Sequence, residues 1–155
     1  MVLKIDRKRA VGLEFVEGLA KGASRSFAAA ARLNLIDCHM RPLVFGLNSL
    51  PGVETLACCE GHGIMGRLSE PYVAFVASAD VAWRFQIALD EANIASHQPL
   101  AYWWDMRARY RPDGILVYHL VAPTLNRHLW VTRRKLNRDF AALLALFKTA
   151  YENRI

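Results

Sequence analysis

The sequence predicts a single α+β domain in which helices cover a mixed or antiparallel sheet. Two pairs of expected strands are each followed by an expected helix, an order typical of this class. Asp113-Gly114 separates two β-prone runs and is a strong hairpin signal. After Thr132, apolar residues recur at helical spacing and fall on one side of a helix. We assign residues 1–155 to one domain, because a chain of this length buries about 68 to 70 % of its unfolded surface.

The first third of the chain is expected to be mainly helical. An imperfect helical pattern covers residues 6–21, and a second, Ala-rich helical segment covers 27–33. Asp37 stands where an N-cap belongs, and apolar residues follow it at spacings of three and four. Pro42 fits the first turn of this helix, and residues 48–52 are turn formers that end it.

Two strand–strand–helix units are expected in the rest of the chain. The expected elements are strands over 53–59 and 72–77, a helix over 81–92, strands over 100–110 and 115–121, and a helix from Thr132 towards the C-terminus. Asp80 is the expected N-cap of the first of these helices. Residues 124–131 fit either a helical start or a short extended piece. The two units, 53–92 and 100–153, suggest pseudo-symmetry, although no residue repeat is visible.

Composition and charge narrow the class of protein. An apolar fraction of 54 % with 22 % charged residues is typical of a globular domain. The net charge of +6 and a pI near 9.5 favour an anionic partner such as RNA or a nucleotide. The N-terminal residues lack the apolar core of a signal peptide, and no apolar run approaches the roughly 20 residues that span a bilayer. Three cysteines, two of them adjacent, suit a reducing compartment. We therefore expect a cytoplasmic protein without a membrane segment.

The candidate site is the stretch from Glu54 to Gly63, where an apolar strand ends in thiol, carboxylate and imidazole side chains separated by glycines. We assign Cys59, Glu60 and His62 to catalysis, as nucleophile, orienting group and base. His62 lies between two glycines, which permit close approach of a ligand. They also place His62 in an exposed turn, where a role in core packing is harder to explain. Cys58 is expected on the opposite face of the strand, and either cysteine is equally explained as a small packing residue.

Five further residues complete the candidate site as ligand-binding groups. They are Thr55, Gly61, Gly63, Arg67 and His119. The glycines match neither a Walker loop nor a dinucleotide-binding fingerprint. No residue is assigned to a metal, because adjacent cysteines lack the spacing of a structural zinc site and four suitable ligands are not evident.

Residues 102–111 alternate between two faces of an expected strand. The expected core face holds Tyr102, Trp104, Met106, Ala108 and Tyr110. The expected outer face holds Trp103, Asp105, Arg107, Arg109 and Arg111. A basic face with an aromatic residue can stack bases and contact phosphates, although a solvated surface also explains it.

The stretch 35–49, followed by Thr55-Leu56-Ala57-Cys58-Cys59-Glu60-Gly61-His62, resembles the tRNA methyltransferases that act at the third step of wybutosine synthesis. Those proteins carry an Ile-Asp, Pro-Leu and Ile-Asn run before a Thr-Thr-Ser-Ser-Cys-Ser-Gly-Arg motif. Thr55, Cys59 and Gly61 coincide with that motif, whereas its serines and its arginine are replaced here. The resemblance covers about residues 35–63, and 116–120 is similar to a later family strand that contains a histidine.

The resemblance implies an α+β fold and S-adenosylmethionine-dependent methylation of a modified guanosine in tRNA. Because Cys58, Glu60 and His62 replace polar, anion-contacting residues, we expect a shared scaffold with a different ligand or reaction. The leading hypothesis is a nucleotide- or RNA-binding protein with the site at residues 59–66. The alternatives are a non-catalytic interaction or accessory protein of plasmid or phage type, and a metal-dependent hydrolase.

Overall fold

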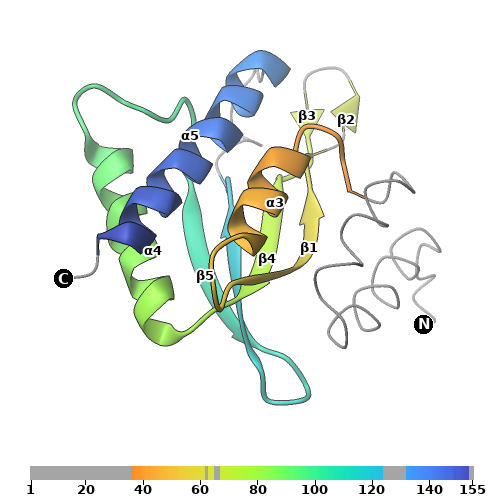
Figure 1. Cartoon of the computed structure of the whole chain (residues 1–155). Helices are drawn as coiled ribbons and strands as arrows, with labels where there is room; N and C mark the ends of the chain where they lie inside the picture. The colour runs from red at the N-terminus through yellow and green to blue at the C-terminus, as the bar shows by residue number, and fades with distance from the viewer. Residues whose placement is uncertain (1–35, 62, 65–66, 124–131, 154–155) are drawn as a thin grey trace, which may run out of the picture.

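The computed structural model describes residues 36–61, 63–64, 67–123 and 132–153. Within these ranges, three helices and a four-stranded antiparallel sheet form an α+β fold, which confirms the predicted class (Figure 1). The helices are α3 (Arg41–Asn48), α4 (Ala79–Ile94) and α5 (Arg133–Glu152). The strands of the main sheet are β1 (Glu54–Cys59), β4 (Tyr72–Val76), β5 (Asp105–Tyr110) and β6 (Leu116–Val121). Two short strands, β2 (Gly63–Ile64) and β3 (Arg67–Leu68), pair separately.

The main sheet has the strand order β1-β4-β6-β5, and every neighbouring pair is antiparallel. β1 and β4 form one hairpin-like pair followed by α4, and β5 and β6 form a second pair followed by α5. The second strand of each pair is central and the first is at an edge. From either edge of the sheet, the order is therefore first strand then second strand of a unit.

The three helices lie together on one face of the sheet (Figure 1). The core between the layers is aromatic: Phe85 of α4 stacks on Phe147 of α5 with ring centroids 4.5 Å apart, and Phe75 of β4 lies 6.1 Å from Phe85. All three rings are fully buried. Burial of one such side chain contributes about 1.5 to 3 kcal/mol, so this cluster accounts for much of the attachment of the helices to the sheet.

The N-cap of α4 differs from the predicted one. Ser78 has extended backbone angles, and its hydroxyl accepts a hydrogen bond from the N–H of Val81. The prediction of Asp80 as the cap is wrong: Asp80 lies within the first turn, where a carboxylate is favoured by the helix dipole, and pairs with Arg84 at 2.8 Å. Thr132 caps α5, as its position at the predicted start suggests.

The prediction of Asp37 as the N-cap of α3 is also wrong. The N-cap position belongs to Met40, which provides no side-chain hydrogen bond, and Pro42 falls in the first turn as expected. The carboxylate of Asp37 instead accepts a hydrogen bond from the backbone N–H of Glu60 at 2.9 Å. The segment before α3 is therefore tied to the end of β1.

β5 begins at Asp105, five residues later than the sequence pattern suggested. Upstream of it, the backbone N–H groups of Ala101 and Tyr102 donate to the carboxylate of Asp139 on α5, and that of Trp104 donates to the side chain of Asn93 on α4. Side chains of the helices thus take the place of a partner strand.

Some expectations fall outside the described residues. They are the helices over 6–21 and 27–33, and the ambiguous piece over 124–131. In the described part of the chain, no helix has both the length and the apolar character needed to cross a bilayer.

Candidate functional site

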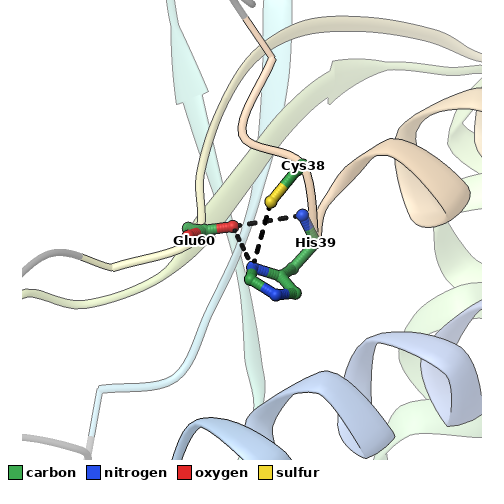
Figure 2. Close-up of side chains that lie close together, drawn as sticks. All are labelled: Cys38, His39 and Glu60. Carbon is green, nitrogen blue, oxygen red and sulfur yellow. Dashed lines mark hydrogen bonds and ion pairs between the residues drawn. The ribbon is translucent and has the colours of Figure 1, made fainter.

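Three chemically capable side chains converge where the segment before α3 meets the end of β1. Cys38 and His39 come from the turn before α3, and Glu60 follows the last residue of β1 (Figure 2). The Nδ1 atom of His39 lies 2.9 Å from Oε2 of Glu60 and 3.4 Å from Sγ of Cys38. The backbone N–H of His39 donates to the same Oε2 at 3.2 Å. We call these three residues the junction cluster.

The end of β1 is held rigidly beside this cluster. Arg133, the first residue of α5, donates from its two terminal nitrogens to the backbone carbonyls of Glu60 at 2.8 Å and Gly61 at 2.7 Å. The same guanidinium lies 3.8 Å from Oε1 of Glu60. Because Arg133 faces Oε1, Oε2 is the oxygen that faces the cluster. Asp37 accepts a hydrogen bond from the N–H of Glu60, so two segments distant in sequence, one before α3 and one at the start of α5, fix this residue.

Gly61 is required by the local backbone. Its φ is +79°, in the left-handed region that favours glycine, and a Cβ atom there would lie 2.6 Å from the carbonyl oxygen of Ser69. The turn that follows β1 can therefore close against 69–71 only with glycine at this position.

The two adjacent cysteines face different environments, as predicted. Cys58 pairs with Val73 in the sheet and packs against the core beneath the helices. Burial, with the nearby charge of Asp37 as a smaller cause, raises the pKa of the Cys58 thiol to about 12. Its thiolate form is therefore scarce at neutral pH, which makes it a poor nucleophile. Cys59 lies on the opposite face, where it pairs with Tyr72.

The face of the sheet opposite the helices brings two predicted residues onto one surface. Cys59 of β1 occupies one row of cross-strand pairs on this face, and His119 of β6 occupies the next row, opposite Arg107 of β5. Burial, and then the positive charge of Arg109, lower the pKa of His119. The imidazole is thus neutral at neutral pH and can donate or accept a hydrogen bond.

The edge strand β5 carries two exposed arginines on this face, and an exposed tryptophan precedes the strand. We define the β5 strip as Arg107 and Arg109 of β5 together with Trp103, two residues before the strand begins. Trp103 is 48 % exposed, and both arginines are exposed. Arg107 pairs with Asp105 at 3.1 Å, whereas Arg109 forms no ion pair with any described residue. The predicted exposure of Trp103, Arg107 and Arg109 is confirmed, whereas Asp105 and Arg111, expected on the same outer face, are half-buried.

The core side of the predicted alternation is confirmed only in part. Tyr102 and Trp104 are buried, and Met106 packs against the core. Ala108 and Tyr110 are exposed, and Ala108 lines an open hollow between β5 and α4 instead of packing against the core.

The remaining predicted site residues have different positions. Thr55 is buried, and its backbone N–H and hydroxyl bond to the side chain of Asn48 on α3, so it joins the helix to β1. Gly63 and Arg67 lie in β2 and β3, which form the small hairpin beyond β1. His62 and the side chain of Arg67 lie outside the described residues. Of the predicted catalytic residues, Glu60 is in the junction cluster and Cys59 is on the other face of β1.

Cys38, His39 and Arg133 were not among the site residues predicted from the sequence. A local signal for the first two exists, because Asp37-Cys38-His39 places three side chains with polar or metal-binding chemistry in a row before a helix. Nothing local marks Arg133, whose partners are more than 70 residues away in sequence.

Comparisons with protein-family models, curated proteins and solved structures found no match to this chain. The resemblance to wybutosine-synthesis methyltransferases therefore stays a prediction.

Proposed function

We propose that the protein binds single-stranded RNA, with the β5 strip as a main part of the binding surface. The observation that carries the proposal is an exposed tryptophan two residues before an edge strand that has two exposed arginines on one face. Aromatic side chains stack on bases, and arginines contact phosphates, in proteins that bind single strands without strong sequence preference. The net charge of +6 favours the approach of a polyanion.

Protection of the sheet edge explains only part of this surface. Charged side chains on an edge strand prevent pairing with other chains, and this accounts for Arg107 and Arg109. It does not account for Trp103, whose large apolar side chain is 48 % exposed just before the strand begins. A base stacked on the indole would cover that surface, and the arginines, two residues apart on one face, can reach successive phosphates of one strand.

The half-buried His119 adds a polar group to the same surface. It lies opposite Arg107 in the register of β5 and β6, and its lowered pKa keeps it neutral. A neutral imidazole can bond to a base edge or a ribose hydroxyl without adding charge.

The test is fluorescence anisotropy of a labelled oligouridine titrated with the protein. Arg107→Ala/Arg109→Ala should weaken binding, and Trp103→Ala should weaken it by about 5- to 150-fold, since stacking of one base is worth about 1 to 3 kcal/mol. Trp103→Phe should retain much of the affinity because the aromatic plane remains.

The matched control removes two charges elsewhere. Lys135 and Lys148 are exposed on α5, in the helical layer. Lys135→Ala/Lys148→Ala lowers the net charge by the same amount as the arginine double variant. An equal loss of affinity in both double variants would show that only the overall charge matters, and it would refute the β5 strip as the binding surface.

Competition experiments separate the ligand classes. A mononucleotide and S-adenosylmethionine serve as competitors in the same assay. Displacement of the oligomer by a mononucleotide would assign the surface to a nucleotide rather than to RNA. A thermal shift with S-adenosylmethionine, lost in His62→Ala, would support the methyltransferase resemblance. Absence of any response to RNA or to these ligands would refute the proposed function.

A further inference from the structure

The junction cluster presents three different metal-ligand atoms to one point. Sγ of Cys38, Nδ1 of His39 and Oε2 of Glu60 all lie within 4.8 Å of one another. Thiolate, imidazole and carboxylate are the three protein ligand types of zinc, with bonds of about 2.0 to 2.3 Å. From these donors and their geometry we propose that the cluster is a binding site for a zinc ion.

The observed separations are close to those that zinc requires. Tetrahedral angles and the usual bond lengths place a zinc-bound nitrogen about 3.4 Å from a bound oxygen and about 3.6 Å from a bound sulfur. The corresponding separations here are 2.9 Å for Nδ1 to Oε2 and 3.4 Å for Nδ1 to Sγ. An opening of about 0.5 Å or less, through rotation of exposed side chains, brings both pairs to the zinc geometry.

The site is accessible yet partly organised in advance. Cys38 and His39 are exposed, so an ion can enter from solvent, whereas the Glu60 side chain is only 14 % exposed. Asp37 and Arg133 fix the backbone of Glu60, and Arg133 faces the carboxylate oxygen that is not directed at the cluster. Such outer partners are what orient the ligands of a metal site.

Charge balance also favours a divalent cation. A cysteine thiolate and a glutamate together carry two negative charges, which a zinc ion neutralises. A catalytic relay fits the geometry less well. In such a relay the cysteine and the orienting carboxylate contact different ring nitrogens, but here both Cys38 and Glu60 contact Nδ1 of His39.

Three protein ligands leave one tetrahedral position for water. This is the arrangement of catalytic zinc sites rather than of closed structural ones, which use four protein ligands. Metal binding at the junction cluster does not depend on RNA binding, because the β5 strip lies at the opposite edge of the sheet.

The experiment uses the full-length chain, reduced and stripped of metal with a chelator. Cobalt(II) is titrated as an optical probe of the site, and zinc is then added as a competitor. We expect one equivalent of cobalt, a thiolate-to-cobalt charge-transfer band, and visible bands of the intensity typical of four-coordinate cobalt. Zinc should displace the cobalt and remove both signals. Failure of the wild-type protein to bind either ion at micromolar concentrations would overturn the proposal.

Three variants remove one ligand each, and one variant serves as the control. Cys38→Ser should abolish the charge-transfer band, and His39→Gln and Glu60→Gln should each weaken zinc binding by more than about 100-fold, since changes to outer partners alone cost about 10- to 100-fold. Cys59→Ser removes the neighbouring thiol on the other face of β1 and should bind as the wild type does. Wild-type binding by all three ligand variants, with Cys59→Ser defective, would place the metal elsewhere and refute the site. Circular dichroism of each variant shows that the fold is retained, and His39→Gln, at an exposed turn, keeps the test valid if another variant unfolds.

Discussion

Asp139 anchors the stretch that presents Trp103, and we predict that its removal destabilises the whole domain. The Asp139 side chain is fully buried and accepts hydrogen bonds from the N–H of Ala101 at 2.7 Å, the N–H of Tyr102 at 3.0 Å and the indole N–H of Trp104 at 3.0 Å. These donors lie on both sides of Trp103. The carboxylate therefore sets the backbone from which that tryptophan faces solvent.

The size of the effect follows from the donors that would lose their partner. Tyr102 and Trp104 are buried, so water does not replace the carboxylate at their N–H groups in Asp139→Ala. Each buried donor left unsatisfied costs about 1 to 3 kcal/mol, and two of them give about 2 to 6 kcal/mol. Domains of this kind have total stabilities of about 5 to 15 kcal/mol, so the variant should be severely weakened or unfolded.

A conservative variant reveals the ionisation of Asp139. Burial raises the pKa of its carboxyl above the ordinary 3.8, and the hydrogen bonds it accepts oppose this shift only in part. A raised pKa in the folded state means that the folded protein binds the proton more tightly than the unfolded chain does. The resulting stabilisation is complete below the ordinary pKa and is lost as pH rises through the folded-state pKa. The free energy of unfolding of the wild type should therefore fall, relative to that of Asp139→Asn, as pH rises through this window.

Urea unfolding followed by circular dichroism and tryptophan fluorescence measures both effects. Asp90→Ala is the matched control, because Asp90 is exposed on α4 and its loss should change the stability by less than about 0.5 kcal/mol. A change in Asp139→Ala no larger than that in the control would show that the three hydrogen bonds are not what holds 101–104. A wild-type stability that rises against Asp139→Asn over the same pH window would refute the direction of the pKa shift.

Three further predictions concern the ligand surface, the thiols and the turn. In the double variant of the two β5 arginines, the slope of log K for RNA against log salt concentration should decrease by about 1.4, since each phosphate contact on a single strand contributes about 0.7; an unchanged slope in anisotropy titrations would contradict phosphate contact. Cys38, which is exposed, should be alkylated faster than Cys58, whose pKa is raised to about 12 by burial. Peptide mass spectrometry at successive times measures the two rates, and equal rates would contradict this prediction. Gly61→Ala should lower the melting temperature more than Gly114→Ala, because both have positive φ but only the first has a backbone oxygen 2.6 Å from the new Cβ; similar shifts in a thermal scan would rule out the steric cause.

Regular local patterns were enough to predict most of the fold. The alternation over 105–110 and the helical spacing after Thr132 depend on neighbours a few residues apart, and the structure confirms a strand and a helix there. The start of β5 could not be found in this way. The residues before it have β-forming side chains, but their backbone groups bond to Asp139 and Asn93, and no local pattern records those partners.

The site was harder to predict than the fold, for the same physical reason. Aspartate is a residue type favoured at N-caps, yet the carboxylate of Asp37 accepts a hydrogen bond from the N–H of Glu60, 23 residues away. Arg133 binds the carbonyls of Glu60 and Gly61 from the start of the last helix. Long-range partners override local propensity here, so the sequence indicated the end of β1 as a chemical centre without indicating the groups that face it.

The consecutive residues Cys58, Cys59 and Glu60 at the end of β1 face three different environments and do not form one site. Because successive strand residues point to opposite faces, Cys58 enters the core and Cys59 faces the other side. Glu60, just past the strand, turns to a third environment beside Cys38 and His39. Residues that are adjacent in sequence thus serve packing, the second sheet face and the junction cluster separately. A variant of one should leave the others intact, and this separation is what allows Cys59→Ser to act as the control for a metal site one residue away.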